Sequence, residues 1–105
     1  MAITVLIEFD IKASFYRQFQ HILSNNLVET QKYDGCLDVQ MYSQVEGESI
    51  MVLLQWVSIS SHRDYLEWRF KQPNTGQELS MLKSKPTIRY FKQSTITSIK
   101  PDEDS

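Results

Sequence analysis

Cysteine and glycine are both scarce in this chain of 105 residues. The single cysteine, Cys36, cannot form an intramolecular disulfide, which excludes a disulfide-stapled fold and favours a cytoplasmic location. Three glycines are too few for a glycine-rich phosphate loop, and the sequence contains no nucleophile elbow. Two histidines and one cysteine at unrelated spacings do not form a zinc-binding pattern. We therefore expect no metal site and no phosphate-loop chemistry.

Long apolar runs and clusters of basic residues are missing as well. The longest apolar run covers residues 50–54, far short of the roughly 20 residues that span a bilayer. Lysine and arginine number 11 and are scattered along a chain of net charge −2, so they form no basic stripe for nucleic acid. The first residues lack the basic, apolar and small-residue layout of a secretory signal. We expect no membrane segment and no nucleic-acid partner.

Four segments have the pattern of strands. Apolar residues occupy every second position of residues 3–9, which predicts a first strand. Segments 37–42 and 50–57 flank a turn at residues 46–48 and predict a hairpin. Both faces of segment 50–57 are apolar, so both should be covered. Residues 86–91, where a proline is tolerated as the first residue, predict the last strand.

Two long segments and one short segment have helical spacing. Apolar residues at positions 15, 19, 22, 23 and 27 lie on one stripe, which predicts a first helix with Ser14 as its N-cap. A second helix should begin at the serines of positions 60 and 61 and end before Pro73. Thr75 and Glu78 have the spacing of a capping box and predict a short third helix.

The order of these elements predicts an α+β fold. A β-α-β-β-α-β order is typical of a ferredoxin-like domain, in which both helices pack on one face of a four-stranded antiparallel sheet. The other face would then expose Met51, Leu53 and Val57, so we expect a homodimer in which two sheets cover each other. We assign this domain to residues 1–93. Residues 94–105 form a C-terminal extension, with a short edge strand expected at 95–99 and a disordered acidic tail at 101–105.

Several of these features resemble the antibiotic biosynthesis monooxygenase family of the dimeric α+β barrel superfamily. They are the opening strand, the Asp34-Gly35-Cys36 turn, the strand that ends in Gln55-Trp56, the helix directly after it and the closing strand from Pro86. The resemblance covers residues 2–93. It implies a dimeric α+β barrel with a pocket between sheet and helices in each subunit. It also implies oxygenation of a small aromatic or quinol-type substrate without metal or flavin.

The resemblance carries over to individual residues only in part. Trp56 corresponds to a tryptophan at the pocket wall, where a large aromatic could stack on a planar substrate. The family often has a histidine about nine residues after this tryptophan, and that position is Tyr65 here, with His62 one helical turn earlier. His62 and Tyr65 are therefore the candidate proton acceptors. Leu66 and Glu8 do not match the pattern of the haem-degrading relatives, so haem degradation is disfavoured.

Each candidate also has a structural interpretation. Trp56 could be an ordinary core tryptophan, and His62 a solvated histidine in the first turn of a helix. Tyr42 and Arg89 complete the predicted substrate pocket, although a tyrosine with a buried ring and a solvated hydroxyl, and an arginine in a surface ion pair, are the favoured interpretations. His21 lies beside the core stripe of the first helix and is assigned a structural role.

Three functions are compatible with such a scaffold. The first is a cofactor-independent monooxygenase, with His62 or Tyr65 as the proton acceptor. The second is a non-oxidative enzyme such as an isomerase, and the third is a non-catalytic dimer that binds a small molecule. The fold alone does not distinguish them, because one scaffold hosts unrelated chemistries.

Overall fold

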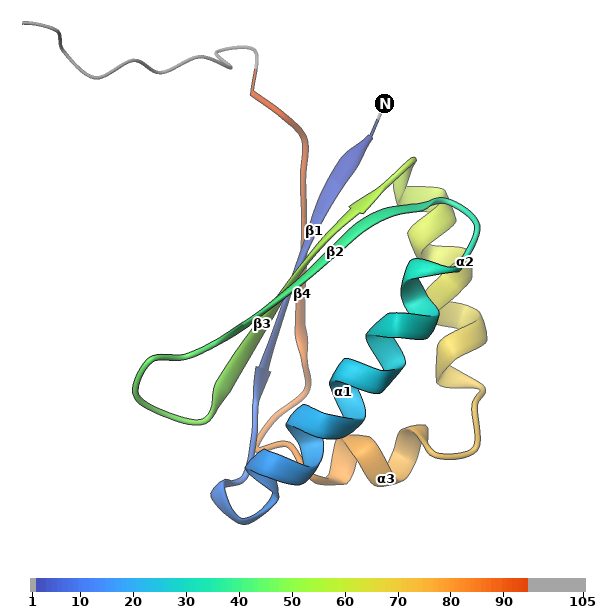
Figure 1. Cartoon of the computed structure of the whole chain (residues 1–105). Helices are drawn as coiled ribbons and strands as arrows, with labels where there is room; N and C mark the ends of the chain where they lie inside the picture. Colours follow the sequence, from blue (N-terminus) through green and yellow to red (C-terminus); the bar gives the residue numbers. More distant parts are fainter. Residues whose placement is uncertain (1, 95–105) are drawn as a thin grey trace, which may run out of the picture.

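One antiparallel sheet of four strands forms one layer of the molecule, beside the layer of helices (Figure 1). The computed structural model describes residues 2–94. The strands lie in the order β2-β3-β1-β4, which places the first and third strands in the centre. Their bounds are β1 Ile3–Asp10, β2 Cys36–Ser43, β3 Ser49–Trp56 and β4 Thr87–Phe91.

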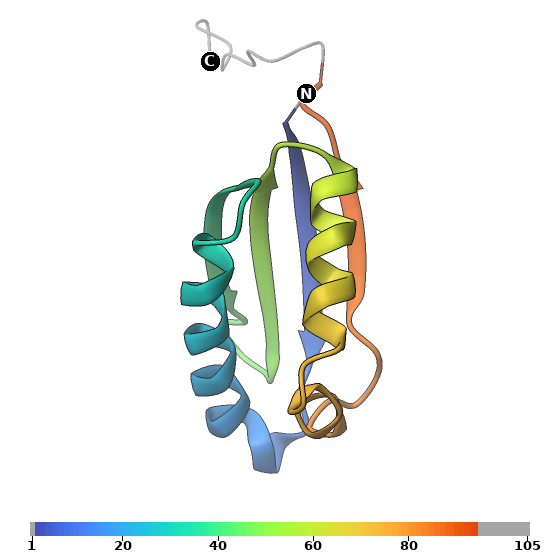
Figure 2. The same ribbon diagram turned by 90° about the vertical axis from the view of Figure 1, so that its right-hand side faces the viewer.

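All helices lie on one side of this sheet (Figures 1 and 2). They are a 3₁₀ turn at Ala13–Phe15, α1 at Tyr16–Gln31, α2 at Ile59–Phe70 and α3 at Thr75–Ser80. Helices α1 and α2 run along the strands, one beside the other, and α3 lies at the lower end of α2 (Figure 2). The predicted α+β, ferredoxin-like fold is confirmed.

The core lies between the sheet and the helices. Side chains of a strand alternate between its two faces, and the register aligns inward-facing Val5 of β1 with Leu54 of β3 and with Tyr90 of β4. The inward residues Ile50, Val52, Leu54 and Trp56 of β3 are all buried. This strand contributes more buried hydrophobic residues than any other described strand, and burial of apolar surface stabilises a fold by about 25 cal/mol per Å².

The helix starts differ from the sequence prediction. Phe15 and not Ser14 occupies the N-cap of α1, because a 3₁₀ turn at residues 13–15 precedes the helix. Helix α2 begins earlier than predicted, since the hydroxyl of Ser58 accepts a hydrogen bond from the Ser61 amide at 3.0 Å. Helix α3 has no side-chain cap at Asn74, so the predicted capping box is wrong.

Gly35 fits between the turn after α1 and the start of α2. Its φ of 97° lies in the left-handed region, which favours glycine. A Cβ atom at this position would lie 3.1 Å from the Cβ of Ser61. The Gly35 carbonyl also accepts a hydrogen bond from the Val57 amide at 2.9 Å. A larger residue would therefore push apart the two segments that hold the beginning of α2.

The outer face of the sheet is partly apolar. Leu6 of β1 pairs with Leu53 of β3, and Met51 of β3 pairs with Tyr42 of β2. None of the described helices covers this face (Figure 2). Val57 lies just beyond the end of β3 and is 41% exposed. The described part of the chain therefore leaves an apolar strip that runs across three strands.

The predicted edge strand at 95–99 and the acidic tail at 101–105 lie outside residues 2–94. Within residues 2–94, no helix has both the length and the apolar character that crossing a membrane requires.

Candidate functional site

A cavity of about 120 Å³ lies between the sheet and helices α1, α2 and α3. Most of its wall is aliphatic or aromatic, with Phe19 from α1, Leu54 from β3 and Ile88 from β4. A dry apolar cavity of about 150 Å³ is enough to bind benzene. The cavity therefore has room for about one aromatic ring.

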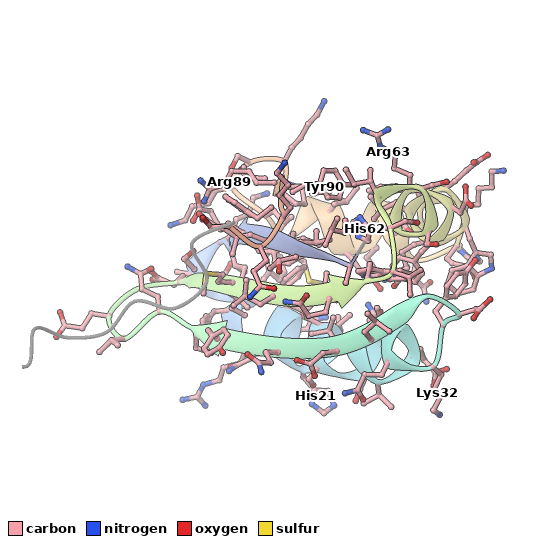
Figure 3. All side chains as sticks on the ribbon, turned by 90° about the horizontal axis from the view of Figure 1, so that it is seen from above. His21, Lys32, His62, Arg63, Arg89 and Tyr90 are labelled. Carbon is pink, nitrogen blue, oxygen red and sulfur yellow. The ribbon has the colours of Figure 1, made fainter. Side chains whose placement is uncertain are left out.

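His62 contributes to the cavity wall a side chain with a buried hydrogen-bonding atom that is unused. Its position in the first turn of α2 turns the imidazole inward, and the side chain is fully buried. Nδ1 lies 2.9 Å from the hydroxyl of Tyr90 on β4, and Figure 3 shows these residues next to each other, with Arg63 nearby. Nε2 has no hydrogen-bond partner among residues 2–94. The alternative of a solvated histidine is wrong.

Burial makes His62 a neutral imidazole. Desolvation lowers its pKa from 6.5 to about 4, because an apolar surrounding disfavours the charged form. One ring nitrogen of a neutral imidazole donates a hydrogen bond and the other accepts one. If Nδ1–H donates to the Tyr90 oxygen, Nε2 has a free lone pair. A ligand hydroxyl in the cavity could then donate its hydrogen to Nε2.

Tyr65 lies one turn further along α2 and also lines the cavity. The Thr30 hydroxyl donates to the backbone oxygen of Asn26 at 3.0 Å, and it lies 2.6 Å from the Tyr65 hydroxyl. Since a threonine hydroxyl has one hydrogen, Tyr65 must be the donor of that second bond. Burial raises the pKa of Tyr65, so this phenol keeps its proton and is a poor base.

Trp56 is fully buried and supports the wall from behind. It is not among the side chains that line the cavity. Its ring centroid lies 5.2 Å from that of His62 and 5.3 Å from that of Tyr65. Rings at such distances contribute packing energy beyond their buried area. Trp56 therefore fixes the orientation of both candidate residues, and it touches the cavity only through them.

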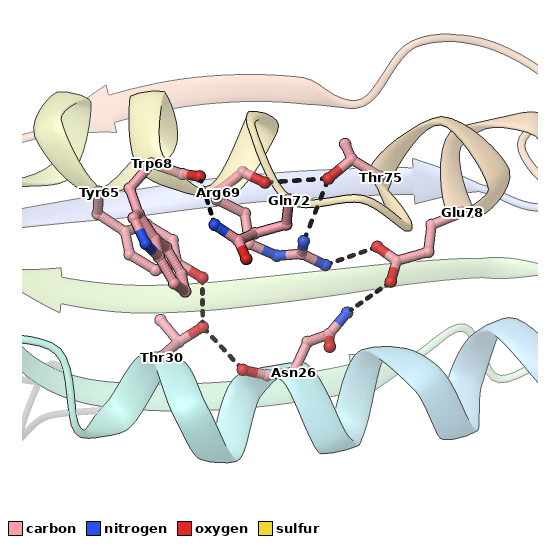
Figure 4. A network of polar contacts seen from close by, with 8 residues as sticks. All are labelled: Asn26, Thr30, Tyr65, Trp68, Arg69, Gln72, Thr75 and Glu78. Carbon is pink, nitrogen blue, oxygen red and sulfur yellow. Dashed lines mark hydrogen bonds and ion pairs between the residues drawn. The ribbon is translucent and has the colours of Figure 1, made fainter.

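A polar network closes the opposite end of the cavity (Figure 4). Arg69 of α2 forms a 2.6 Å ion pair with Glu78 of α3. Glu78 also accepts a 3.3 Å hydrogen bond from the Asn26 amide of α1. Thr75 accepts from the Arg69 guanidinium at 3.3 Å and donates to the Arg69 backbone oxygen at 2.9 Å. Three helices thus meet at this end through polar side chains.

No family model and no curated protein matches this sequence. Solved structures do share its architecture. A conserved protein from Methanosarcina mazei Go1 is 19% identical, with a TM-score of 0.70 over 90% of this chain and 94% of its own. An antibiotic biosynthesis monooxygenase is 9% identical, with a TM-score of 0.69 over 86% of this chain and 96% of its own.

A candidate antibiotic biosynthesis monooxygenase from Deinococcus radiodurans gives a similar result. It is 15% identical, with a TM-score of 0.68 over 96% of this chain and 100% of its own. The chain shares the fold of these proteins. Identities this low establish shared architecture only, since one architecture hosts many chemistries.

The cavity and the sheet register separate the five predicted site residues into three groups. His62 and Tyr65 line the cavity, and Trp56 packs behind them. Tyr42 and Arg89 belong to the outer face of the sheet, because their neighbours in β2 and β4 point inward. Arg89 there forms a 2.9 Å ion pair with Glu8. These two residues cannot contact a ligand in the cavity of their own subunit.

Two other residues of the sequence analysis lie away from the cavity. His21 is exposed on α1 and points away from the sheet (Figure 3). Burial raises the pKa of the Cys36 thiol, which makes it a weak nucleophile. Within residues 2–94, no three histidine, cysteine or acidic side chains gather closely enough to hold a metal ion.

The residues that make the site polar were not among the predicted site residues. Arg69 had a usable signal, because it follows His62 by seven positions and Tyr65 by four, which places all three on one face of a helix. Tyr90 could not be linked to His62 from local spacing, since that contact depends on the pairing of β4 with β1. Thr30 follows Leu27 by three positions, so its spacing alone indicates only that it continues the buried stripe of α1.

Proposed function

We propose that the protein is a cofactor-independent monooxygenase whose substrate is a one-ring phenol with a free para carbon, bound in the cavity. The observation that supports this best is the free Nε2 of buried His62 in the wall of an otherwise largely apolar cavity. A buried polar atom without a partner costs free energy. A ligand hydroxyl that donates to Nε2 would remove this cost.

The proposed reaction needs only the substrate and dioxygen. His62 accepts the phenol proton, and the phenolate gives one electron to dioxygen, which forms a phenoxyl radical and superoxide. The two combine at the ring carbon para to the oxygen, and the resulting peroxide takes up a proton. Loss of the hydrogen on that carbon then breaks the O–O bond. One oxygen atom stays as a quinone carbonyl and the other leaves as water, so a phenol and O₂ yield a quinone and H₂O.

Proton transfer to His62 is uphill but within reach. A phenol with a pKa of about 10 and an imidazole with a pKa of about 4 differ by about 8 kcal/mol. The phenolate and imidazolium that form attract each other by about 4 kcal/mol at a separation of about 4 Å. About 4 kcal/mol remains, which is a small part of an enzymatic barrier. Tyr90 then accepts the hydrogen of Nδ1 and keeps the ring in place.

The low pKa of His62 also favours one alternative, a non-catalytic small-molecule-binding dimer. A neutral imidazole that resists protonation is well suited to hold a ligand by a hydrogen bond without taking its proton. Such a protein would be stabilised by phenols, by about 2.7 kcal/mol at a hundred times the dissociation constant, and would not consume oxygen.

The proposal includes a homodimer formed by the outer faces of two sheets. Leu6, Met51 and Leu53 form the centre of that face, and their partial exposure supports this arrangement. An apolar strip of this kind is typical of surfaces that associate. The ion pair between Arg89 and Glu8 lies beside it and would form part of a polar rim. We place this dimer in the cytoplasm, where a free cysteine stays reduced.

Oxygen uptake with resorcinol tests the function. Resorcinol has one electron-rich ring and a free carbon para to a hydroxyl. The wild-type protein should consume oxygen, and His62→Gln should lower the rate by about 10²-fold or more. His21→Gln makes the same chemical change on the exposed side of α1 and should keep the wild-type rate. Stabilisation by resorcinol without oxygen uptake would favour the binding protein instead.

A further inference from the structure

A second hollow adjoins the cavity on the outside of the molecule. It is a groove of about 210 Å³ between α1, α2 and the loop that leads to α3. Trp68, Gln72 and Pro73 form part of its floor and walls. The side chains common to the groove and the cavity are Asn26, Tyr65, Arg69 and Glu78. These four side chains are therefore a shared wall between the two spaces.

Arg69 and Glu78 form the central part of this wall. Their charged groups meet at 2.6 Å, and their side chains are only 19% and 16% exposed. Asn26 holds Glu78 from α1, and Thr75 holds the Arg69 guanidinium (Figure 4). Both charges are satisfied within the protein, so the pair offers neither an unpaired cation nor an unpaired anion to a ligand.

The pair lies at the far end of the cavity from His62. Seven residues of α2 separate His62 from Arg69, which corresponds to about 10 Å along the helix axis. A phenol whose hydroxyl contacts Nε2 of His62 has its ring among the apolar side chains between these two ends. A second ring in the para position would be directed at the ion pair.

We propose that Arg69 and Glu78 are specificity-determining residues that restrict the site to ligands with one aromatic ring. The inference rests on the proposed function for the placement of the phenol hydroxyl at His62. When the bulk of the pair is removed, the cavity and the groove become one continuous site. A two-ring ligand can then place its first ring beside His62 and its second ring beside Trp68.

Binding of phenol and of 4-phenylphenol to the full-length protein, measured by calorimetry, tests this inference. The informative quantity is the ratio of their two dissociation constants. In Glu78→Ala this ratio should shift by about tenfold or more in favour of 4-phenylphenol. Glu67→Ala breaks the exposed pair with Lys71 on the same helix. This control should keep the wild-type ratio, because Glu67 does not line the cavity.

Two double variants separate bulk from charge and protect against misfolding. Glu78→Ala leaves Arg69 without its partner, so Arg69→Ala/Glu78→Ala, which leaves no unpaired charge, is measured beside it. This variant should show the same shift. Arg69→Met/Glu78→Leu fills the same space with apolar atoms and should keep the wild-type ratio. The inference would be overturned by a shift in Arg69→Met/Glu78→Leu, or by no shift in both of the open variants, Glu78→Ala and Arg69→Ala/Glu78→Ala.

Benzene and biphenyl repeat the comparison without the hydroxyl. One outcome is that phenol fails to bind the wild-type protein while the ratio of dissociation constants shifts in favour of biphenyl over benzene in Glu78→Ala and Arg69→Ala/Glu78→Ala. That result would support the size restriction and contradict the proposed function. If both pairs of ligands keep their wild-type ratios in the open variants, Arg69 and Glu78 do not restrict the site.

Discussion

Lowering the pH should destabilise the folded protein through His62. Burial lowers the pKa of this residue from 6.5 to about 4 in the folded state. Between these values the unfolded chain binds a proton that the folded chain does not bind. The contribution of His62 to the free energy of unfolding is therefore complete above about pH 6.5 and is lost as the pH falls towards about 4.

The size of this effect follows from the pKa shift. The whole shift corresponds to about 3 kcal/mol, of which about 2 kcal/mol should be lost between about pH 7.5 and about pH 5. A loss of about 2 kcal/mol is substantial beside the free energy of unfolding of a typical domain, which is about 5 to 15 kcal/mol. Carboxylates titrate in the same range, so a comparison with a variant without the imidazole is needed.

Urea denaturation of the wild-type protein and of His62→Leu at both pH values measures the effect. The wild-type protein should lose about 2 kcal/mol more than His62→Leu on acidification. His21→Leu removes the exposed histidine and should behave like the wild-type protein. Equal pH dependence of wild type and His62→Leu would refute the assignment of a buried neutral imidazole, as would an NMR titration of His62 with a pKa near 6.5.

Three more predictions follow from the contacts around the cavity and the sheet. Thr30→Val leaves the Tyr65 hydroxyl without its acceptor and should cost about 1 to 3 kcal/mol in urea denaturation; unchanged stability would contradict this. Leu53→Asp should yield monomers or insoluble protein in sedimentation experiments, whereas Leu37→Asp, at an exposed position of the edge strand, should leave the dimer intact. Tyr90→Phe removes the partner of His62 and should slow oxygen uptake with resorcinol by about tenfold; an unchanged rate would exclude a positioning role.

The strands could be predicted because their signal is local. Alternation along residues 3–9 and 50–57 reflects which face of the sheet is buried, and the helical stripe of α1 reflects the same rule with another period. Alternation along segment 37–42 does not place the side chain of Leu37. An irregularity between Cys36 and Asp38 in the pairing of β2 with β3 leaves this side chain 57% exposed.

The polar end of the cavity could not be predicted because its contacts are formed between helices. Thr75 and Glu78 have the spacing of a capping box, and local rules give them that role. In the fold, the Arg69 guanidinium donates hydrogen bonds to both side chains. These bonds are favoured over a capping box because a charge-assisted hydrogen bond is stronger than a neutral one. Similarly, Tyr42 and Arg89 are plausible pocket residues in the sequence, and only the sheet register places them on the outer face.

Oxidation of resorcinol under ¹⁸O₂ tests the proposed function most directly. The account predicts a hydroxyquinone with one labelled oxygen atom, formed by the wild-type protein and lost in His62→Gln. An unlabelled product would contradict a monooxygenase. A ligand that stabilises the protein and is recovered unchanged would also contradict it and would identify the cavity as a binding site.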